Sequence, residues 1–413
     1  MDYKIADRAL APSGKKKIRW AKQYMPVLRL LEEKYRKEQP LAGTVISACL
    51  HLEAKTACLL ILLKDLGAKV TAAGSNPLST QDDICAALVE NGVSVFSRHG
   101  MTTEEYFENV RSALSVKPNI IVDDGADLVA TVHSEMRELL PGIRGGSEET
   151  TSGVKRLKSM ANGSVLAFPM ISVNDAHSKY LFDNRYGTGQ SVMDGILRTT
   201  NMLVAGKNVV IAGYGWCGRG VAMRASAMGA RVIVTEIDPH RAFEALMDGY
   251  EVASMDDAAS RGDIFLTLTG NTRVIRREHF GKMKDGVLLG NAGHFDVEIC
   301  KPDLLDLSSS VEETRPGVET YTLKDGRRIH LLGEGRLVNL ACADGHPIEI
   351  MDLSFALQLE SAVFLAKNSL KPGLYDVPEA IDRAVMEAKL ASLHIRLDRM
   401  TPEQEEYMKS WVE

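Results

Sequence analysis

Five residues with side chains suited to proton transfer lie in or beside apolar stretches of this sequence. His51 follows the apolar run TVISACL, and Asp124 closes the run NIIVDD. Lys179 and Asp183 are four residues apart, and His294 follows a glycine in GNAGHFD. Imidazole, carboxylate and amine groups are the usual general acids and bases, so this set suits a reaction with several proton transfers. Taken singly, each histidine is more often a hydrogen-bonded core or surface residue.

A glycine-rich motif, GYGWCG at 213–218, follows an apolar run and opens a predicted helix. Gly213 permits the tight turn, Gly215 lets the backbone approach a pyrophosphate, and Gly218 allows close packing of helix on strand. The phosphates then face the helix N-terminus. Glu236 ends the next apolar run 18 residues after Gly218, where a carboxylate accepts hydrogen bonds from ribose hydroxyls and repels a 2′-phosphate. The motif predicts NAD rather than NADP, and the alternative for Glu236 is a surface salt bridge.

Alternating apolar runs and helical stretches must position these residues. The runs start near residues 44, 69, 93 and 119, about 25 residues apart, which is the length of one strand–helix unit. Helices are predicted over 53–66 and 80–91, and another opens at the capping box of Thr102 and Glu105. Ligands bind beyond the carboxyl ends of parallel strands, so His51, Asn76 and Asp124 are expected to share one cleft.

A second α/β pattern begins near residue 190. Strands are expected at 206–212, at 230–238, in DIFLTLTG and in GVLLGNAG, and residues 321–338 read as a hairpin turning at Asp325-Gly326. The last segment, 376–413, reads as two amphipathic helices, the second opened by Thr401-Pro402.

Composition narrows the class of protein. The chain has 413 residues, 45% hydrophobic and 25% charged, with a net charge of -6, which argues against a general nucleic-acid footprint. The six cysteines form no C-x-x-C pair and read as reduced thiols, and no metal site is predicted. The N-terminus lacks an apolar signal region, and no apolar run is long enough to span a bilayer. A cytoplasmic protein without membrane contact is therefore expected.

Longer motifs resemble the adenosylhomocysteinase family over nearly the whole chain. They include SNPLSTQDD, DDGADL, LLPGIRGGSEETTSGV, FDNRYG, TEIDP, GHFDVEI and GRLVNLACADGHP. The resemblance implies bound NAD, a homotetramer, and reversible cleavage of a nucleoside–homocysteine thioether. It also implies an α/β fold with two Rossmann-like parallel-sheet domains. These are a substrate domain (1–185 and 340–375) with an inserted NAD-binding domain (186–339), followed by a small helical segment (376–413).

The resemblance assigns roles to the proton-transfer residues. Lys179 and Asp183 are expected at the 3′ hydroxyl of the ribose, with the lysine partly neutral or relaying a proton. Asp124 resembles the base that removes the C4′ proton. His51 and His294 resemble the acid–base pair for thiol loss and water addition.

The remaining site residues also come from the resemblance. Glu149 and Thr150 are expected to bind the ribose hydroxyls, Asn184 to steer Lys179 or the nicotinamide, and His346 to gate the substrate mouth. Besides Gly213, Gly215, Gly218 and Glu236, the cofactor contacts are expected to be Thr150, Thr151, Ser152, Asn184, Asn271, Asn291 and Asn339.

The purine end departs from the family pattern H-M-T-x-E-T. Here the run is H-L-E-A-K-T, with Glu53, Lys55 and Thr56 as candidate base contacts. Lys55 supplies a donor for O6 of hypoxanthine and Glu53 an acceptor for N1–H, whereas adenine presents the reverse pattern. This favours S-inosyl-homocysteine over S-adenosyl-homocysteine as substrate. The alternative is that Glu53 and Lys55 pair with other charges at the helix start.

Two further features concern the cofactor site and the class of reaction. Many family members carry a C-terminal Lys and Tyr that reach the neighbouring subunit's NAD, and the sequence ends at S-W-V-E without that motif. The alternatives to a hydrolase are an NAD-dependent 2-hydroxy-acid dehydrogenase and a non-catalytic NAD-binding regulator.

Overall fold

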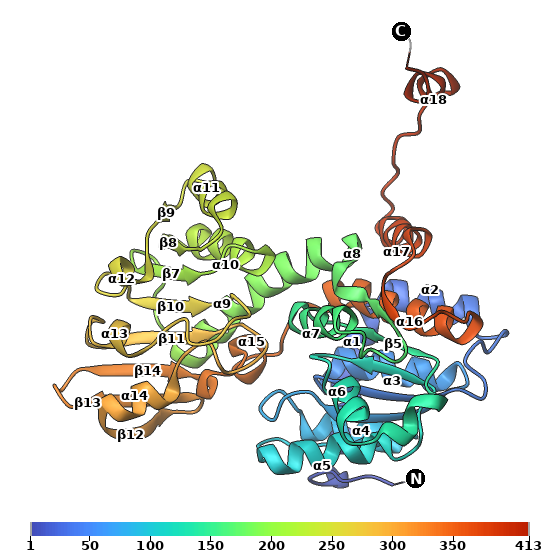
Figure 1. Ribbon diagram of the computed structural model, residues 1–413, viewed down its shortest axis with the longest axis horizontal. Coiled ribbons are helices and arrows are strands. Elements are labelled where there is room, and N and C mark those ends of the chain that lie inside the picture. The colour runs from blue at the N-terminus through green and yellow to red at the C-terminus, as the bar shows by residue number, and fades with distance from the viewer. Residues whose placement is uncertain (1, 412–413) are drawn as a thin grey trace.

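Two β-sheets, each covered by helices, organise the structure, a computed structural model that describes residues 2–411 (Figure 1). The first sheet has seven strands in the order β15-β6-β5-β4-β1-β2-β3, and every neighbouring pair is parallel. Its strands are β1 (Val45–Leu50), β2 (Lys69–Gly74), β3 (Ser94–Phe96), β4 (Ile120–Asp123), β5 (Gly145–Glu148), β6 (Pro169–Ser172) and β15 (Gly373–Asp376). The predicted strands match β1 to β4, whereas β5, β6 and β15 were not predicted.

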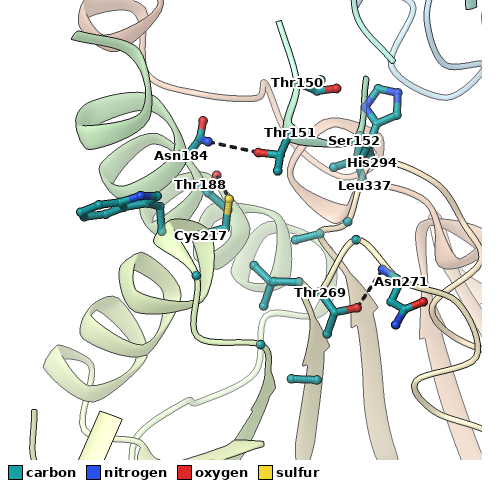
Figure 2. A pocket seen from close by; sticks show the side chains of 18 of the residues that line it. Thr150, Thr151, Ser152, Asn184, Thr188, Cys217, Thr269, Asn271, His294 and Leu337 are labelled. Atoms are coloured by element: carbon teal, nitrogen blue, oxygen red, sulfur yellow. Dashed lines mark hydrogen bonds between the residues drawn. The ribbon is translucent and has the colours of Figure 1, made fainter. Parts of the chain in front are cut away.

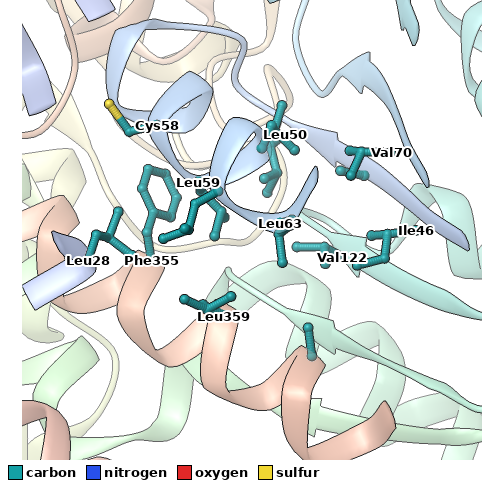
Figure 3. Packing of buried hydrophobic residues seen from close by; sticks show 14 of the residues in the cluster. Leu28, Ile46, Leu50, Cys58, Leu59, Leu63, Val70, Val122, Phe355 and Leu359 are labelled. Atoms are coloured by element: carbon teal, nitrogen blue, oxygen red, sulfur yellow. The ribbon is translucent and has the colours of Figure 1, made fainter. Parts of the chain in front are cut away.

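Helices from both ends of the chain cover this sheet. They are α1 (Ala11–Gln23), α2 (Pro26–Tyr35), α3 (Ala54–Asp65), α4 (Asp82–Glu90), α5 (Thr103–Leu114), α6 (Asp127–Ser134), α7 (Thr151–Asn162) and α16 (Ile348–Lys367). The predicted capping box of Thr102 and Glu105 opens α5. Leu59 and Leu63 of α3 pack with Phe355 and Leu359 of α16 in one buried cluster (Figure 3). Burying each such side chain stabilises the fold by about 1.5–3 kcal/mol.

The second sheet has eight strands in the order β12-β13-β14-β11-β10-β7-β8-β9. Its strands are β7 (Asn208–Ala212), β8 (Arg231–Thr235), β9 (Glu251–Val252), β10 (Ile264–Thr267), β11 (Val287–Asn291), β12 (Ser308–Arg315), β13 (Val318–Leu323) and β14 (Arg328–Leu332). The predicted hairpin around Asp325-Gly326 is confirmed as β13 and β14. Antiparallel β12 and β13 extend a sheet that is otherwise parallel.

The helices on this second sheet include α9 (Thr188–Thr200), α10 (Trp216–Ala227) and α11 (Pro239–Met247). Shorter helices follow as α12 (Met255–Ala258), α13 (Arg277–Phe280) and α14 (Lys301–Leu307). The remaining short turns are η1 (Arg8–Leu10), η2 (Arg137–Gly142), η3 (Val173–Asp175) and η5 (Gly333–Gly335).

The chain passes between the two sheets twice. It leaves the first through α8 (His177–Lys179), the π-helix η4 (Tyr180–Gly187) and α9, and it returns through α15 (Val338–Ala341) into α16. The second sheet is thus an insertion between two parts of the first unit, which confirms the expected fold class. The domain boundaries given above stay predictions.

The C-terminal segment contains the two expected helices, α17 (Glu379–Ser392) and α18 (Pro402–Lys409), and α18 begins at the capping box of Thr401 and Gln404. α17 packs on α16, whereas α18 buries no residue and projects away from the body (Figure 1). Among the described residues, no helix is long and apolar enough to cross a membrane.

Candidate active site

A large cavity lies between the two sheets and is lined by residues from both. Its volume is about 1190 Å³. Sites for one drug-sized ligand span about 300–1,000 Å³, so there is room for more than one small molecule. All five residues predicted to transfer protons and all seven predicted to bind substrate line it: His51, Asp124, Lys179, Asp183, His294, Glu53, Lys55, Thr56, Glu149, Thr150, Asn184 and His346.

The carboxyl ends of three neighbouring strands place the first group of polar residues. β1 lies between β2 and β4, so the residues that follow these strands meet at one edge. His51 Nε2 lies 3.2 Å from Asp124 Oδ2, and Ser75 Oγ donates to the same oxygen at 3.3 Å. His51 Nδ1 is held by Ser79 Oγ at 2.7 Å. Asn76, expected in this cleft, instead accepts the backbone N–H of Leu78 within its own turn.

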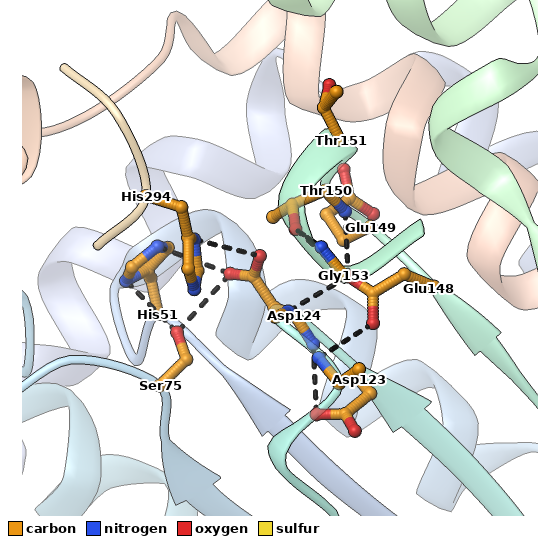
Figure 4. A network of polar contacts seen from close by, with 12 residues as sticks. His51, Ser75, Asp123, Asp124, Glu148, Glu149, Thr150, Thr151, Gly153 and His294 are labelled. Carbon is orange, nitrogen blue, oxygen red and sulfur yellow. Dashed lines mark hydrogen bonds and ion pairs between the residues drawn. The ribbon is translucent and has the colours of Figure 1, made fainter. Parts of the chain in front are cut away.

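His294 brings the second sheet's unit into this cluster (Figure 4). It follows β11, and its Nδ1 lies 3.8 Å from Asp124 Oδ1. That buried oxygen has no hydrogen-bond partner among the described residues. Gly125 makes the approach possible, because a Cβ at this position would lie 2.5 Å from His294 Nε2. The cluster therefore joins acid and base groups of both units around one free carboxylate oxygen.

The same three side chains place their ligand-type atoms within 4.8 Å of one another, as metal ligands do. His51 and Asp124 already contact each other directly, so this spacing by itself assigns no ion.

A π-helix aligns a second group of polar side chains. Asp183 and Asn184 are four and five residues after Lys179, and the wider turn of η4 directs all three side chains to one place. Lys179 Nζ lies 3.2 Å from Asp183 Oδ1 and donates to Asn184 Oδ1 at 2.8 Å. Glu149, after β5, lies 3.6 Å from the same ammonium.

Burial and charge set the protonation of these groups. Burial opposes the charged form of Lys179, but Asp183 and then Glu149 outweigh it and raise its pKa. The raised pKa favours the ammonium form of Lys179 over a partly neutral amine, and the alternative of a proton relay stays a prediction. Burial raises the pKa of Glu149 to about 7 and lowers the pKa of His51 to about 4.

The glycine-rich loop between β7 and α10 forms the other half of the cavity. Gly213 has φ 98°, a conformation that suits glycine, and Gly215 is the N-cap of α10. Gly218 does not line the cavity, and a Cβ there would collide with the Gly213 carbonyl oxygen. It serves helix–strand packing, as its place in the motif predicted, and its expected direct contact with the cofactor is corrected. Glu236 follows β8 and accepts the Tyr214 N–H at 2.7 Å, which ties the two loops together.

Polar residues from both units surround the remaining predicted cofactor space (Figure 2). Asn184 Nδ2 donates to Asn174 Oδ1 at 3.0 Å and contacts Thr151 Oγ1 at 3.5 Å. Asn339 Oδ1 is buried without a hydrogen-bond partner among the described residues. A glycine loop that lines the cavity at a helix N-terminus, a carboxylate after the second strand and a free amide oxygen together fit a dinucleotide. The predicted contacts Thr150, Thr151, Ser152, Asn271 and Asn339 all line the cavity.

Asn291 corrects one cofactor prediction. It is fully buried and does not line the cavity. Its amide donates to the carbonyl oxygens of Gly293, Phe295 and Gly335 and accepts from Thr267 Oγ1. Asn291 therefore shapes the loop that carries His294, and its hydrogen-bonding groups are used within the protein.

The purine end departs from the sequence-based prediction for Glu53. Its carboxylate caps α3 by accepting the backbone N–H groups of Lys55 and Thr56, and it also accepts the Thr56 hydroxyl. Lys55 Nζ lies 2.8 Å from the carboxylate and donates to the Asp344 carbonyl at 2.6 Å. The alternative pairing at the helix start is thus observed, and Glu53 has no free lone pair for a base. The Lys55 ammonium has one donor left.

His346, expected as a gate, lies beside a catalytic carboxylate. Its Nδ1 is 3.0 Å from Asp183 Oδ1, and its Nε2 is 3.3 Å from Thr188 Oγ1. Its gating role stays a prediction.

Several polar residues of the site were missed in the sequence. Ser354 donates to Asp183 at 2.7 Å, and Gln358 donates to Glu149 at 2.5 Å. These two are spaced four apart within the apolar helix α16, and that spacing was a signal for a polar face on the site. Glu148, which ends the unpredicted strand β5, was also missed.

The sequence is similar to known proteins over nearly its whole length. The family model described as "S-adenosyl-L-homocysteine hydrolase" matches residues 2–140, and that described as its "NAD binding domain" matches residues 184–345. The chain is 58% identical to an adenosylhomocysteinase of Thermococcus kodakarensis, over 99% of this chain and 98% of that protein. It is 55% identical to an S-inosyl-L-homocysteine hydrolase of Methanopyrus kandleri, over 100% and 98% of the two chains.

Proposed function

Since this chain belongs to the S-adenosyl-L-homocysteine hydrolase family, we propose that it reversibly hydrolyses an S-nucleosyl-L-homocysteine to a nucleoside and L-homocysteine. The observation that carries the proposal is the convergence of Asp124, His51 and His294 beside the Lys179–Asp183 pair in one cavity. The similarity of the chain to hydrolases also favours this reaction over the two alternatives, a 2-hydroxy-acid dehydrogenase and a non-catalytic NAD-binding regulator. Formation of the thioether from homocysteine and a nucleoside tests it.

The NAD-binding half of the cavity explains how a poor leaving group departs. Bound NAD supplies reversible oxidation of the ribose 3′ carbon. A ketone at C3′ acidifies the neighbouring C4′ proton, so that homocysteine leaves by elimination and water adds to the enone. We assign the binding of the cofactor to seven residues that line the cavity: Thr150, Thr151, Asn184, Gly213, Gly215, Glu236 and Asn339.

The acid and base roles follow from protonation and position. Asp124 Oδ1 is the free carboxylate oxygen of the cluster, and we assign it the C4′ proton. The low pKa of His51 keeps its imidazole neutral, so it can take the proton of the attacking water. His294 lies beside it, with the two ring centroids 6.0 Å apart, and we assign it protonation of the leaving sulfur. Lys179, as an ammonium, binds the 3′ hydroxyl, and the Glu149 carboxylate accepts the proton of that hydroxyl.

We assign recognition of the base to Lys55, with S-inosyl-L-homocysteine as the preferred substrate. Lys55 is buried and lines the cavity, and its remaining N–H can donate to O6 of hypoxanthine. An amino group at position 6 of adenine would oppose this donor at a cost of about 1–3 kcal/mol. Relatives with either substrate in their names are similar to this chain, so the ratio of kcat/KM for inosine and adenosine decides between them.

We further propose that the protein is a cytoplasmic homotetramer. All six cysteines are unpaired, as in reducing compartments. The C-terminal arm, residues 393–411, exposes Leu397, Met408 and Trp411 by 64%, 71% and 95%, and so large an apolar surface favours a partner. A second copy of the chain is the partner we assign. Light scattering should give a mass four times the 45.2 kDa of the chain, and a monomer mass would contradict the proposal.

A further inference from the structure

Glu148 ends β5 next to the loop that carries Asp124 (Figure 4), and it does not line the cavity between the two sheets. Its side chain is completely buried. Oε1 accepts the backbone N–H of Gly125 at 2.9 Å and that of Thr150 at 2.9 Å, and Oε2 accepts the backbone N–H of Ala126 at 3.0 Å. The Thr150 hydroxyl also donates to Oε1 at 3.1 Å. One carboxylate thus joins two loops that carry active-site residues.

The turn held by Glu148 is strained. Gly125 and Ala126 have φ of 107° and 62°, so two successive residues adopt left-handed conformations. Such a conformation costs a residue with a side chain on the order of 1–3 kcal/mol unless its surroundings impose it. Both N–H groups of the turn point to the Glu148 carboxylate, which supplies that constraint.

The strained turn positions Asp124 and His294. Asp124 immediately precedes it, and Gly125 is the residue against which His294 packs. On the other side, Thr150 caps α7 by accepting the Gly153 N–H at 3.0 Å. Gly153 has no room for a side chain, because a Cβ would collide with the Glu148 carboxylate. The carboxylate therefore sits against the N-terminal turn of α7, where helix N–H groups favour negative charge.

We propose that Glu148 is a positioning residue of the reaction: it holds the strained Gly125–Ala126 turn so that Asp124 and His294 meet at the reacting carbon. It contacts no substrate and transfers no proton. The proposal rests on the proposed function for its catalytic readout. A displacement of about 1 Å in a catalytic group can cost about 100-fold in rate.

The test compares Glu148→Ala with Asp352→Ala in the full-length protein with bound NAD. Asp352 is a matched control, because it is also fully buried and accepts two backbone N–H groups, those of Val27 and Leu28, at 3.1 and 3.0 Å, on the opposite side of α16 from Ser354. Both variants should melt at lower temperature. Only Glu148→Ala should lower kcat, by ~100-fold. In this variant the rate of exchange of the C4′ hydrogen with heavy water should fall more than the rate of oxidation at C3′.

Two further variants keep the test decisive. Glu148→Gln retains one acceptor oxygen, so it should fold normally and keep an intermediate kcat. Adding Ala126→Gly to Glu148→Ala removes the strain at residue 126 and should restore kcat by ~10-fold. Equal loss of kcat in Asp352→Ala and Glu148→Ala, or no rescue by Ala126→Gly, would overturn the proposal. An inactive wild-type protein would instead count against the proposed function.

Discussion

Glu149 Oε1 lies 3.6 Å from Lys179 Nζ and is buried without a hydrogen-bond donor among the described residues. Gln358 donates only to the other oxygen. A buried carboxylate with one free oxygen beside a lysine ammonium is poised to accept the proton of a ribose hydroxyl. The ionisation of Glu149 is therefore expected to set the pH dependence of the reaction.

The activity should rise with pH across neutrality. Burial raises the pKa of Glu149 to about 7, so the carboxylate that accepts a proton is formed only as the pH passes this value. We expect kcat/KM to increase between about pH 6 and pH 8, and Glu149→Gln to lose this rise together with most of the activity. A Glu149→Gln profile that keeps the wild-type rise would assign the titration to another group.

Asp124→Asn should separate oxidation from elimination. An amide cannot remove the C4′ proton, whereas the Lys179–Glu149 pair is intact in this variant. We expect reduced cofactor to accumulate on the protein after nucleoside is added, while thioether formation falls by about 10²–10⁴-fold. Absorbance of the bound reduced nicotinamide and mass spectrometry of the product give the two readouts. The exposed Asp194→Asn serves as the control and should match wild type in both.

Gly218→Ala should weaken cofactor binding without touching the cofactor. The new Cβ collides with the Gly213 carbonyl oxygen and forces α10 away from the loop. Overpacking of this kind costs about 1–3 kcal/mol, so the NAD affinity should fall by about 5- to 150-fold. Gly142→Ala is the control, since nothing lies within 4 Å of its Cβ position. Equal NAD affinity in the two variants would argue against a dinucleotide at this loop.

The preference for the base should shift in the double variant Glu53→Thr, Lys55→Glu. Threonine can still cap α3, and the new carboxylate at position 55 accepts where Lys55 donates. We expect the ratio of kcat/KM for inosine over adenosine to fall by at least about 10-fold. Lys64→Glu, a charge reversal near the other end of α3, should leave the ratio unchanged. An unchanged ratio in the double variant would remove Lys55 from base recognition.

The sequence was informative where one pattern determines one position. Apolar runs spaced about 25 residues apart predicted β1 to β4, and the parallel order then places His51 and Asp124 together. The short strand β5, GGSE, carries no apolar run, so neither the strand nor Glu148 at its end was predicted.

Contacts between segments that are far apart in the sequence could not be predicted, because no local pattern encodes them. The use of Asn291 within the protein depends on Thr267 and Gly335, which only the folded chain brings to it. The raised pKa of Lys179 likewise depends on Glu149 and Asp183 meeting it in three dimensions.

Thioether formation is the most direct test of the central claim. The purified protein with bound NAD is mixed with homocysteine and either inosine or adenosine, and the product is followed by mass spectrometry and the bulk solution by nicotinamide absorbance. We predict that each chain forms many molecules of S-nucleosyl-homocysteine, chiefly from inosine, and that no free NADH is released. Release of NADH in step with product, or no thioether from either nucleoside, would contradict it.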